Sequence, residues 1–338
     1  MVFVTGGTGL LGTHVLVELV RRGYPVRALF RQVHRIEQAR RCFQHYFKGE
    51  APTAFDKITW VQGDILDIMS LEEGMEGCEA VYHCAAMVSF RKRDFKRLMK
   101  VNKEGTANVV NVALAKGVSI FCHVSSTAAI GKSKMKEVQD ESNKWVKNKS
   151  TSNYAISKYS AENEVWRAKE EGMNVVIVNP SVIFGAGDWK ESSLSIFRVV
   201  YKGLRFYTPG ANAFVDARDV AHIICELAAQ KVYNERFLVI SENLSYRTLF
   251  EKIAAGFGVK PPSIETKRWM AAIAWRIEGV LSFLFGKKQN ITKETAKSAM
   301  TKTHFSNEKI KQALNFEFIP IDQSITDTIS YLKKHPLN

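Results

Sequence analysis

Cysteine is scarce in this sequence of 338 residues, and the patterns that mark a metal site are absent from it. The 5 cysteines are an odd number, lie far apart, and several of them stand in apolar, strand-like runs. They predict reduced thiols in the core of a cytoplasmic protein and not a disulfide framework. The sequence shows no zinc-like spacing of cysteine and histidine and no arginine-rich tail. We therefore expect no bound metal and no nucleic-acid partner.

Long uninterrupted apolar runs are also missing. The nearest approach is residues 267–287, an apolar segment with basic ends that Arg276 and Glu278 interrupt. A membrane-spanning helix needs about 20 mainly apolar residues with few charges, so we expect no spanning segment. The helical spacing of its apolar residues predicts a helix packed on the protein, with a lid or interfacial patch for an apolar substrate as the alternative. Because the chain starts directly in a strand, we expect no signal or transit peptide.

Acidic residues are outnumbered by basic ones. There are 48 lysines and arginines against 34 aspartates and glutamates, which gives a formal net charge of +14. The basic residues are spread over the whole length, and this favours small anionic ligands as the explanation. With 46% hydrophobic residues, the chain has ample material for a buried core. We expect a monomer or a homodimer that acts on a small molecule.

Apolar strand candidates alternate with amphipathic helices along most of the chain. This alternation predicts a doubly wound, parallel α/β sheet of the Rossmann type. The predicted strands are Val2–Val4, Pro25–Phe30, Lys57–Gln62, Ala80–Cys84, Ile120–Val124, Asn174–Asn179 and Arg236–Ser241, and the long helices are Leu98–Lys116 and Asn153–Glu171. After Asn179 the pattern becomes irregular. We therefore predict a discontinuous dinucleotide-binding domain, residues 1–184 and 213–241, and a smaller α/β substrate domain, residues 185–212 and 242–338.

A glycine-rich turn, Thr5–Gly12, joins the first strand to a helix predicted over His14–Arg22. In this context Gly6 allows the tight bend, Gly9 lets the backbone approach a pyrophosphate, and Gly12 lets the helix pack closely on the strand. We assign Thr8, Leu10 and Leu11 of the same turn to the cofactor as well. The alternative is a glycine turn that connects two elements and binds nothing.

The end of the second strand lacks the carboxylate that normally holds the adenosine ribose of NAD. Phe30 stands in that place, and Arg31 and Arg35 follow it. Positive charge at this position favours NADP(H), whose 2′-phosphate it would bind, while NAD(H) stays possible. The alternative is that both arginines belong to a solvated basic helix over Arg31–Arg41.

Tyr154 and Lys158 lie one helical turn apart, so both side chains occupy the same helical face. A free tyrosine, with a pKa near 10, exchanges protons poorly at neutral pH, and the lysine ammonium would lower that pKa. We expect Ser126 to bind the substrate oxygen, with Ser125 and Thr127 as rivals at the same strand end. The alternative is that the pair and the hydroxyls are structural.

Taken together, these motifs resemble those of the extended short-chain dehydrogenase/reductases, the NAD-dependent epimerase/dehydratase family. The further matches are Gly63-Asp64, His83–Ala86 and Asn102 with Gly105-Thr106. Val26–Arg31 and Phe214–Val220 are most similar to the dihydroflavonol 4-reductase and 3β-hydroxysteroid dehydrogenase branch. The resemblance implies the following roles: Asp64 and Ile65 beside the adenine, Ala85 and Ala86 at the centre of the cofactor, Pro180 and Ile183 at the nicotinamide, and Asn102 as the anchor of a water relay.

These observations predict an NADP(H)-dependent reductase of a ketone or aldehyde on a fairly apolar small molecule. Tyr154 would donate the proton, Lys158 would tune it, and the substrate would contact Met87, Ser89, Ser126, Ser181 and the aromatic, basic segment 185–212. Asn179 stands where sugar-nucleotide enzymes of the family often have an arginine before the proline. Two alternatives stay open: a nucleotide-sugar epimerase or dehydratase, for which Lys202 and Arg205 could hold a pyrophosphate, and a non-catalytic dinucleotide sensor.

Overall fold

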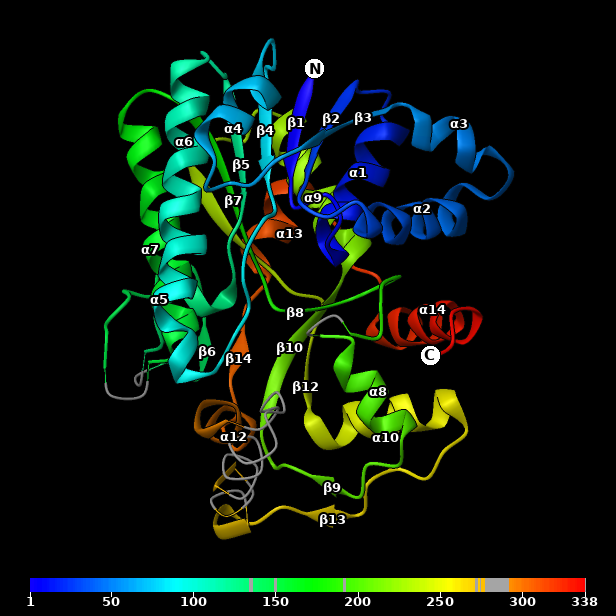
Figure 1. Ribbon diagram of the computed structural model, residues 1–338. Helices are drawn as coiled ribbons and strands as arrows, with labels where there is room; N and C mark the ends of the chain where they lie inside the picture. The colour runs from blue at the N-terminus through cyan, green and yellow to red at the C-terminus, as the bar shows by residue number, and fades with distance from the viewer. Residues whose placement is uncertain are drawn as a thin grey trace.

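The computed structural model describes residues 1–133, 136–148, 151–190, 193–270, 273, 275–276 and 292–337. Its centre is a seven-stranded parallel sheet in the order β11-β7-β5-β4-β1-β2-β3 (Figure 1). The strands are β1 (Val2–Thr5), β2 (Val26–Phe30), β3 (Ile58–Gln62), β4 (Ala80–His83), β5 (Ile120–Val124), β7 (Asn174–Pro180) and β11 (Glu235–Val239). Each predicted strand of the sheet is present, so the prediction of a doubly wound α/β fold is confirmed.

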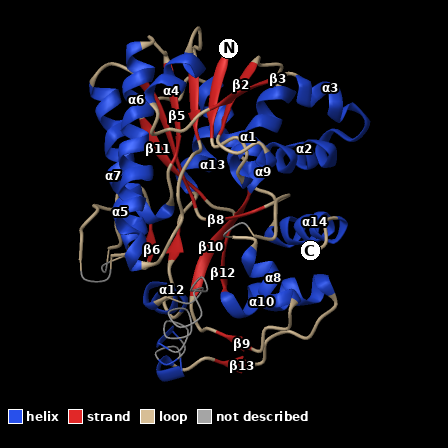
Figure 2. Cartoon of the chain, viewed as in Figure 1, coloured by secondary structure: helices blue, strands red, loops and turns tan. Residues whose placement is uncertain are grey.

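The side chains of these strands are buried on both faces of the sheet, because neighbouring residues of a strand point in opposite directions. Val2 and Val4 pack on one face, and Phe3 packs on the other. Figure 2 shows helices on both sides of the sheet. The first face is covered by α1 (Leu10–Arg21), α2 (His34–Phe47), α3 (Ala51–Asp56) and α9 (Ala217–Ala229), the second by α4 (Ile68–Met75), α6 (Gly105–Ala115) and α7 (Asn153–Glu170).

The direction in which the chain adds strands to the sheet reverses between β3 and β4. From β1 the chain passes to β2 and β3 on one side, and then returns to β4 on the other side. In open parallel sheets, such a switch point opens a crevice at the carboxyl ends of the strands, where ligands bind. The glycine turn after β1 and residues 84–86 after β4 meet at this point.

A second group of elements lies beyond the carboxyl ends of the main strands (Figure 1). Three strands, β8 (Val182–Phe184), β10 (Ala211–Asp216) and β12 (Glu242–Ser245), form a sheet of their own in the order β12-β10-β8. The short pairs are β9 (Phe206–Tyr207) with β13 (Ile264–Glu265), and β6 (Val138–Gln139) with β14 (His304–Phe305). The helices of this group are α8 (Ser195–Tyr201), α10 (Tyr246–Phe257), α12 (Lys293–Ala299) and α14 (Ile321–Lys334), whereas α13 (Glu308–Leu314) packs against β11 of the main sheet and against α9. The division of the chain into two domains stays a prediction.

The predicted helix Leu98–Lys116 is interrupted in the structure. A short helix, α5 (Phe95–Leu98), leads into a π-helical turn, η3 (Met99–Glu104), before α6 continues as a regular α-helix. Asn102 is buried within this turn. Periodicity in the sequence does not reveal a single wide turn, and such turns occur frequently at functional sites.

All five cysteines are free thiols, as predicted, and four of them are buried. Among the described residues, no helix has the length and apolar character needed to cross a bilayer. Residues 271–272, 274 and 277–291 lie outside the described residues, so most of the predicted helix 267–287 lies there as well. No group of three or more potential metal ligands occurs in the described part of the chain.

Candidate active site

The glycine turn after β1 is tightly folded against its neighbours. Gly6 has a φ of +69°, and a Cβ built on it would lie 2.6 Å from the backbone nitrogen of Ala85. A Cβ on Gly12 would collide with the carbonyl oxygen of Gly6 and would lie 2.7 Å from its carbon. These two positions admit only glycine. A Cβ on Gly9 would meet only the Gly6 oxygen, at 3.4 Å, so the described chain leaves the other side of Gly9 open.

Helix α1 begins directly after this open position. Gly9 is its N-cap, and among the described residues no side chain caps the helix there. The free backbone N–H groups of a first turn attract anions, and the helix dipole adds to the effect. Thr8 and Leu10 are half-buried in the turn, whereas Leu11 is buried in the core. The cradle therefore fits a dinucleotide pyrophosphate.

A chain of hydrogen bonds fixes the end of β4 beside this cradle. The Thr5 hydroxyl lies 2.7 Å from Nδ1 of His83 and accepts a bond from the Ala85 backbone N–H at 3.3 Å. The other nitrogen of His83 lies 2.9 Å from the Thr106 hydroxyl. Burial lowers the pKa of His83 to about 3, so its imidazole is neutral. Ala85 is thus held against the glycine turn, where the resemblance put the centre of the cofactor, and the exposed Ala86 follows it.

The predicted adenosine end lies at the end of β2. Arg31 and Arg35 are both exposed there. The Arg31 guanidinium pairs with the Asp64 carboxylate at 3.5 Å, and Arg35 donates to Gln38 at 2.9 Å. Ile65 is buried, and a Cβ on Gly105 would lie 2.6 Å from its Cδ1 atom, so Ile65 packs on the start of α6. The structure therefore brings Arg31 and Asp64 together, and they present opposite charges at one rim of the crevice.

Tyr154 stands at the start of α7, directly facing the end of β5. Ser152 caps the helix and accepts a bond from Ala155 N–H at 3.0 Å, which sets the tyrosine in the first turn. The Ser126 hydroxyl lies close enough to the Tyr154 phenol to lower the pKa of the tyrosine. The ring of Phe90 packs edge-on against the Tyr154 ring, with centroids 5.5 Å apart. Of the three rival hydroxyls, the structure pairs Ser126 with the tyrosine.

Lys158, one turn further along α7, is fully buried, with 2% of its surface exposed. Its Nζ donates to the backbone carbonyl of Val124 at 2.8 Å, so the ammonium is tied to the end of β5. Burial is the largest influence and lowers the pKa of Lys158 to about 8, while the Glu162 carboxylate acts in the opposite direction. A substantial fraction of the ammonium is therefore ready to lose its proton just above neutral pH.

The sequence led us to expect that Lys158 would lower the pKa of Tyr154. The structure corrects this expectation: burial raises the pKa of the tyrosine, and the hydrogen bond with Ser126 is the influence that lowers it. The physical reason is that the Lys158 ammonium is itself desolvated and bonded to Val124, while the phenol loses the solvation of its anion.

Asn102 connects the π-helical turn to two other segments. Its amide oxygen accepts a bond from the Met87 backbone N–H at 2.7 Å, and its amide nitrogen donates to the Met87 carbonyl and to the Ser157 hydroxyl, both at 2.9 Å. This arrangement fixes Met87 and the helix that carries Tyr154. The sequence motif pointed to Asn102 but gave no signal for Ser157, which is buried between the two catalytic candidates on α7.

The end of β7 supplies the remaining predicted residues. Pro180 is buried, Ile183 is half-buried on β8, and the buried hydroxyl of Ser181 has no hydrogen-bond partner among the described residues. A buried, unpaired hydroxyl favours a ligand group that pairs with it. Ser89 is engaged differently: its hydroxyl donates to Asp94 at 2.5 Å, and Asp94 also pairs with Arg91 at 2.8 Å. Ser89 therefore orders its own loop.

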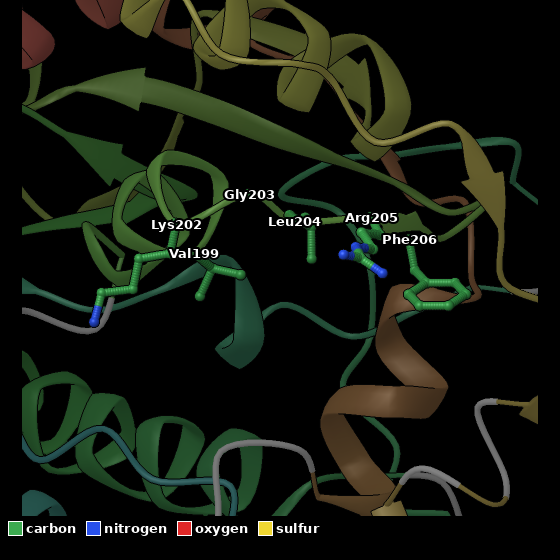
Figure 3. A pocket seen from close by; sticks show the side chains of 6 residues that line it. All are labelled: Val199, Lys202, Gly203, Leu204, Arg205 and Phe206. Carbon is green, nitrogen blue, oxygen red and sulfur yellow. The ribbon is translucent and has the colours of Figure 1, made fainter.

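A hollow of about 340 Å³ is lined by residues of the predicted substrate segment 185–212. These residues lie far along the chain from the catalytic candidates. Figure 3 shows the six residues that line it: Val199, Lys202, Gly203, Leu204, Arg205 and Phe206. Its lining combines apolar side chains with two cationic ones. Trp189 and Tyr207 of the same segment are buried and serve packing, whereas Tyr201 and Phe206 are exposed.

Comparison with known proteins identifies the family to which this chain belongs. The model of the "NAD dependent epimerase/dehydratase family" matches residues 2–239, which contain the glycine turn, Ser126, Tyr154 and Lys158. The chain belongs to this family. It is accordingly a member of a family of oxidoreductases and epimerases that use a nicotinamide dinucleotide.

Individual relatives agree with this placement. The chain is 29% identical over 340 residues to a Synechocystis sp. protein named "Putative dihydroflavonol 4-reductase", covering 98% of this chain and 94% of that protein. It is 27% identical over 345 residues to cinnamoyl-CoA reductase 1 of Petunia hybrida, covering 99% and 92%. The crystal structure of gox2253 superimposes with a TM-score of 0.80 at 27% identity and covers 99% of this chain and 98% of that chain.

Proposed function

We propose that this protein is an NADP(H)-dependent reductase or dehydrogenase that interconverts a ketone and an alcohol on a fairly apolar small molecule. The observation that carries the proposal is the buried Lys158 one helical turn after Tyr154, with the Ser126 hydroxyl near the tyrosine phenol. The two reductases among the relatives support the reaction class.

The cofactor, when bound, supplies the hydride for this chemistry. The cradle of Gly6, Gly9 and Gly12 and the N-terminus of α1 would hold its pyrophosphate, and the unpaired Ser181 hydroxyl is a candidate partner near its nicotinamide end. Arg31 would bind the 2′-phosphate of NADP(H), because no carboxylate follows Phe30 directly. Asp64 lies beside Arg31 and would balance part of its charge.

The chain's own residues handle the proton. Ser126 would donate its hydroxyl to the substrate oxygen, and Tyr154 would transfer its phenolic proton to the same oxygen as negative charge develops there. The raised pKa of Tyr154 keeps the phenol protonated at neutral pH, which suits a proton donor. The Ser126 hydroxyl, which is the influence that lowers the Tyr154 pKa, would then stabilise the phenolate that this transfer leaves behind, and the Lys158 ammonium would hold the ribose hydroxyls of the cofactor.

The substrate would occupy the space in front of Tyr154, bordered by Met87 and Phe90. Phe90 touches the tyrosine ring, and Asn102 holds the backbone of Met87. We propose further that residues 185–212 and 242–338 form a substrate-binding domain, since β9 pairs with β13 and α8 packs against α10 across these two segments.

The test is the oxidation of NADPH and NADH with a panel of ketones, aldehydes and nucleotide sugars. We expect net NADPH consumption with an apolar ketone or aldehyde, and Tyr154→Phe should lower kcat by about 10²- to 10⁴-fold. Tyr159→Phe is the matched control: Tyr159 lies on the same helix and its ring stacks on Trp145 at 4.0 Å, so the variant should turn over as the wild type does. Full activity of Tyr154→Phe would contradict the mechanism, whereas tight NADP(H) binding without net turnover by the wild type would favour an epimerase or a sensor.

A second candidate is a nucleotide-sugar epimerase or dehydratase. The cationic hollow with Lys202 and Arg205 favours it, because such a site could hold a pyrophosphate. This enzyme would show tightly retained cofactor, conversion of the sugar and no net consumption of NADPH.

A further inference from the structure

Glu162 is the most deeply buried carboxylate beside the proposed catalytic residues. It lies on α7 one turn after Lys158, and only 1% of its surface is exposed. A buried charge costs much free energy unless it is paired and hydrogen-bonded, so its position needs a physical explanation.

Both oxygens of this carboxylate are fully engaged. Oε2 accepts bonds from the Ser125 hydroxyl at 2.6 Å and from the Asn179 amide at 2.8 Å. Oε1 accepts from the Arg236 guanidinium at 3.1 Å and from the indole N–H of Trp166 at 3.3 Å. The partners come from the ends of β5 and β7, from β11 and from α7 itself, so one carboxylate ties three strands to the helix that carries Tyr154 and Lys158.

The bonds continue to the proposed catalytic hydroxyl. The same Asn179 amide nitrogen also donates to the backbone carbonyl of Ser126 at 3.1 Å. Glu162 thus holds Ser125 directly and Ser126 through Asn179. Because Lys158 is bonded to Val124, residues 124–126 are fastened to α7 at consecutive positions.

We propose that Glu162 is a positioning residue, whose buried carboxylate sets the orientation of Ser126 through Asn179 and holds Lys158 in its charged form. This inference rests on the proposed function for its catalytic consequence, whereas the geometry of the network does not depend on that function.

The groups around Lys158 support the electrostatic part of the proposal. Facing it are Glu162 from its own helix, His83 from β4, Cys84 just after β4, and His123 from β5. Burial keeps both imidazoles neutral by lowering their pKa and keeps the Cys84 thiol protonated by raising its pKa to about 12. Among these described neighbours Glu162 exerts the largest influence in favour of the ammonium, so its removal should make the ammonium less stable.

The experiment compares Glu162→Gln with Arg236→Gln and with Glu164→Gln. The first removes the carboxylate and keeps its shape, and the second removes the half-buried cation that pairs with Glu162 at 3.1 Å. Glu164 pairs with Arg167 at 3.2 Å on the same helix and makes no contact with the strand ends in the described structure, so its variant is the matched control. The measurements are kcat and KM of NADPH-dependent turnover against pH, and the titration of Lys158 by carbon-13 NMR of labelled lysine, assigned with Lys158→Met.

We expect Glu162→Gln to lower the Lys158 pKa, and with it the pH above which kcat falls, by about one pH unit. At pH 8 kcat should drop by about fivefold, because the charged fraction of Lys158 falls from about one half to about one eleventh, while KM stays within about threefold of the wild-type value. Arg236→Gln should move the same pH upward, because it removes a cation near the carboxylate. Glu164→Gln should change neither quantity.

Two results would overturn the proposal. One is a Glu162→Gln variant with the wild-type Lys158 titration and kcat profile. The other is an Arg236→Gln variant whose Lys158 pKa is unchanged or lower, as expected if Glu162 and Arg236 form only a structural ion pair. This second result decides the question even where Glu162→Gln does not fold. A wild-type protein without any NADPH turnover would refute the proposed function instead, and the NMR titration would still decide the role of Glu162.

Discussion

The sharpest prediction separates the two glycines of the turn after β1. In Gly12→Ala the new methyl group would collide with the Gly6 carbonyl oxygen and lie 2.7 Å from its carbon and 3.1 Å from the Cα atom of Gly7. All three are backbone atoms, so either α1 or the turn must shift. Overpacking of this kind costs about 1–3 kcal/mol. In Gly9→Ala the methyl group meets only the Gly6 oxygen, at 3.4 Å, and φ is −90°, so the fold should accept it.

The assay measures two quantities for each variant: the unfolding free energy from denaturant titration, and the dissociation constant of NADPH from fluorescence titration. Gly12→Ala should lose about 1–3 kcal/mol of stability even without cofactor. Gly9→Ala should keep the wild-type stability within about 0.5 kcal/mol and bind NADPH at least tenfold more weakly, because the methyl group would stand where the pyrophosphate approaches. Wild-type NADPH affinity in Gly9→Ala would refute our placement of the pyrophosphate, and wild-type stability in Gly12→Ala would refute the close contact between helix and turn.

Two further predictions concern charge. Arg31→Ala should weaken NADPH binding about tenfold and leave NADH binding within about twofold, as expected for the loss of one exposed charge-assisted bond to a 2′-phosphate. Arg41→Ala is the control. Equal effects of Arg31→Ala on the binding of both cofactors would contradict the assignment. Asp219 is buried, and desolvation raises its pKa to about 7 from an ordinary value of 3.8. Since the folded state then holds the proton more tightly than the unfolded state, this group's contribution to stability is present below about pH 4 and is lost as pH rises through 7. Asp219→Asn should therefore be more stable than the wild type at pH 8, by on the order of 2–4 kcal/mol, and the difference in unfolding free energy should vanish toward pH 4. Denaturant titrations at both pH values measure this difference. A difference that does not change with pH would show that the aspartate does not titrate in this way.

Local patterns in the sequence were enough to predict the strands of the main sheet and the glycine turn, because both depend on residues close together in the chain. They were not enough for contacts between distant segments. Glu162 is four residues from Lys158, so helical spacing alone could have placed it on the same face, but its partner Arg236 lies on β11 and has no local signal. Likewise, Asn102 meets Ser157 only because the π-helical turn presents it to α7.

The polar face of α7 is an independent argument for the site. Helix α9 packs on the other face of the sheet with mainly apolar residues, among them Val220, Ile223 and Ile224. On α7 the first buried positions are Ser157, Lys158, Ala161 and Glu162, so three of these four are polar, and the later buried positions, Val165 and Ala168, are apolar. Polar residues at core positions reduce stability unless each forms its hydrogen bonds. Here Ser157 bonds to Asn102, Lys158 bonds to the Val124 carbonyl, and Glu162 bonds to Ser125 and Asn179. A helix needed only for packing would bury apolar side chains along its whole length. The half of α7 that departs from this rule is the half that faces the carboxyl ends of β5 and β7, where the switch-point rule places the ligand.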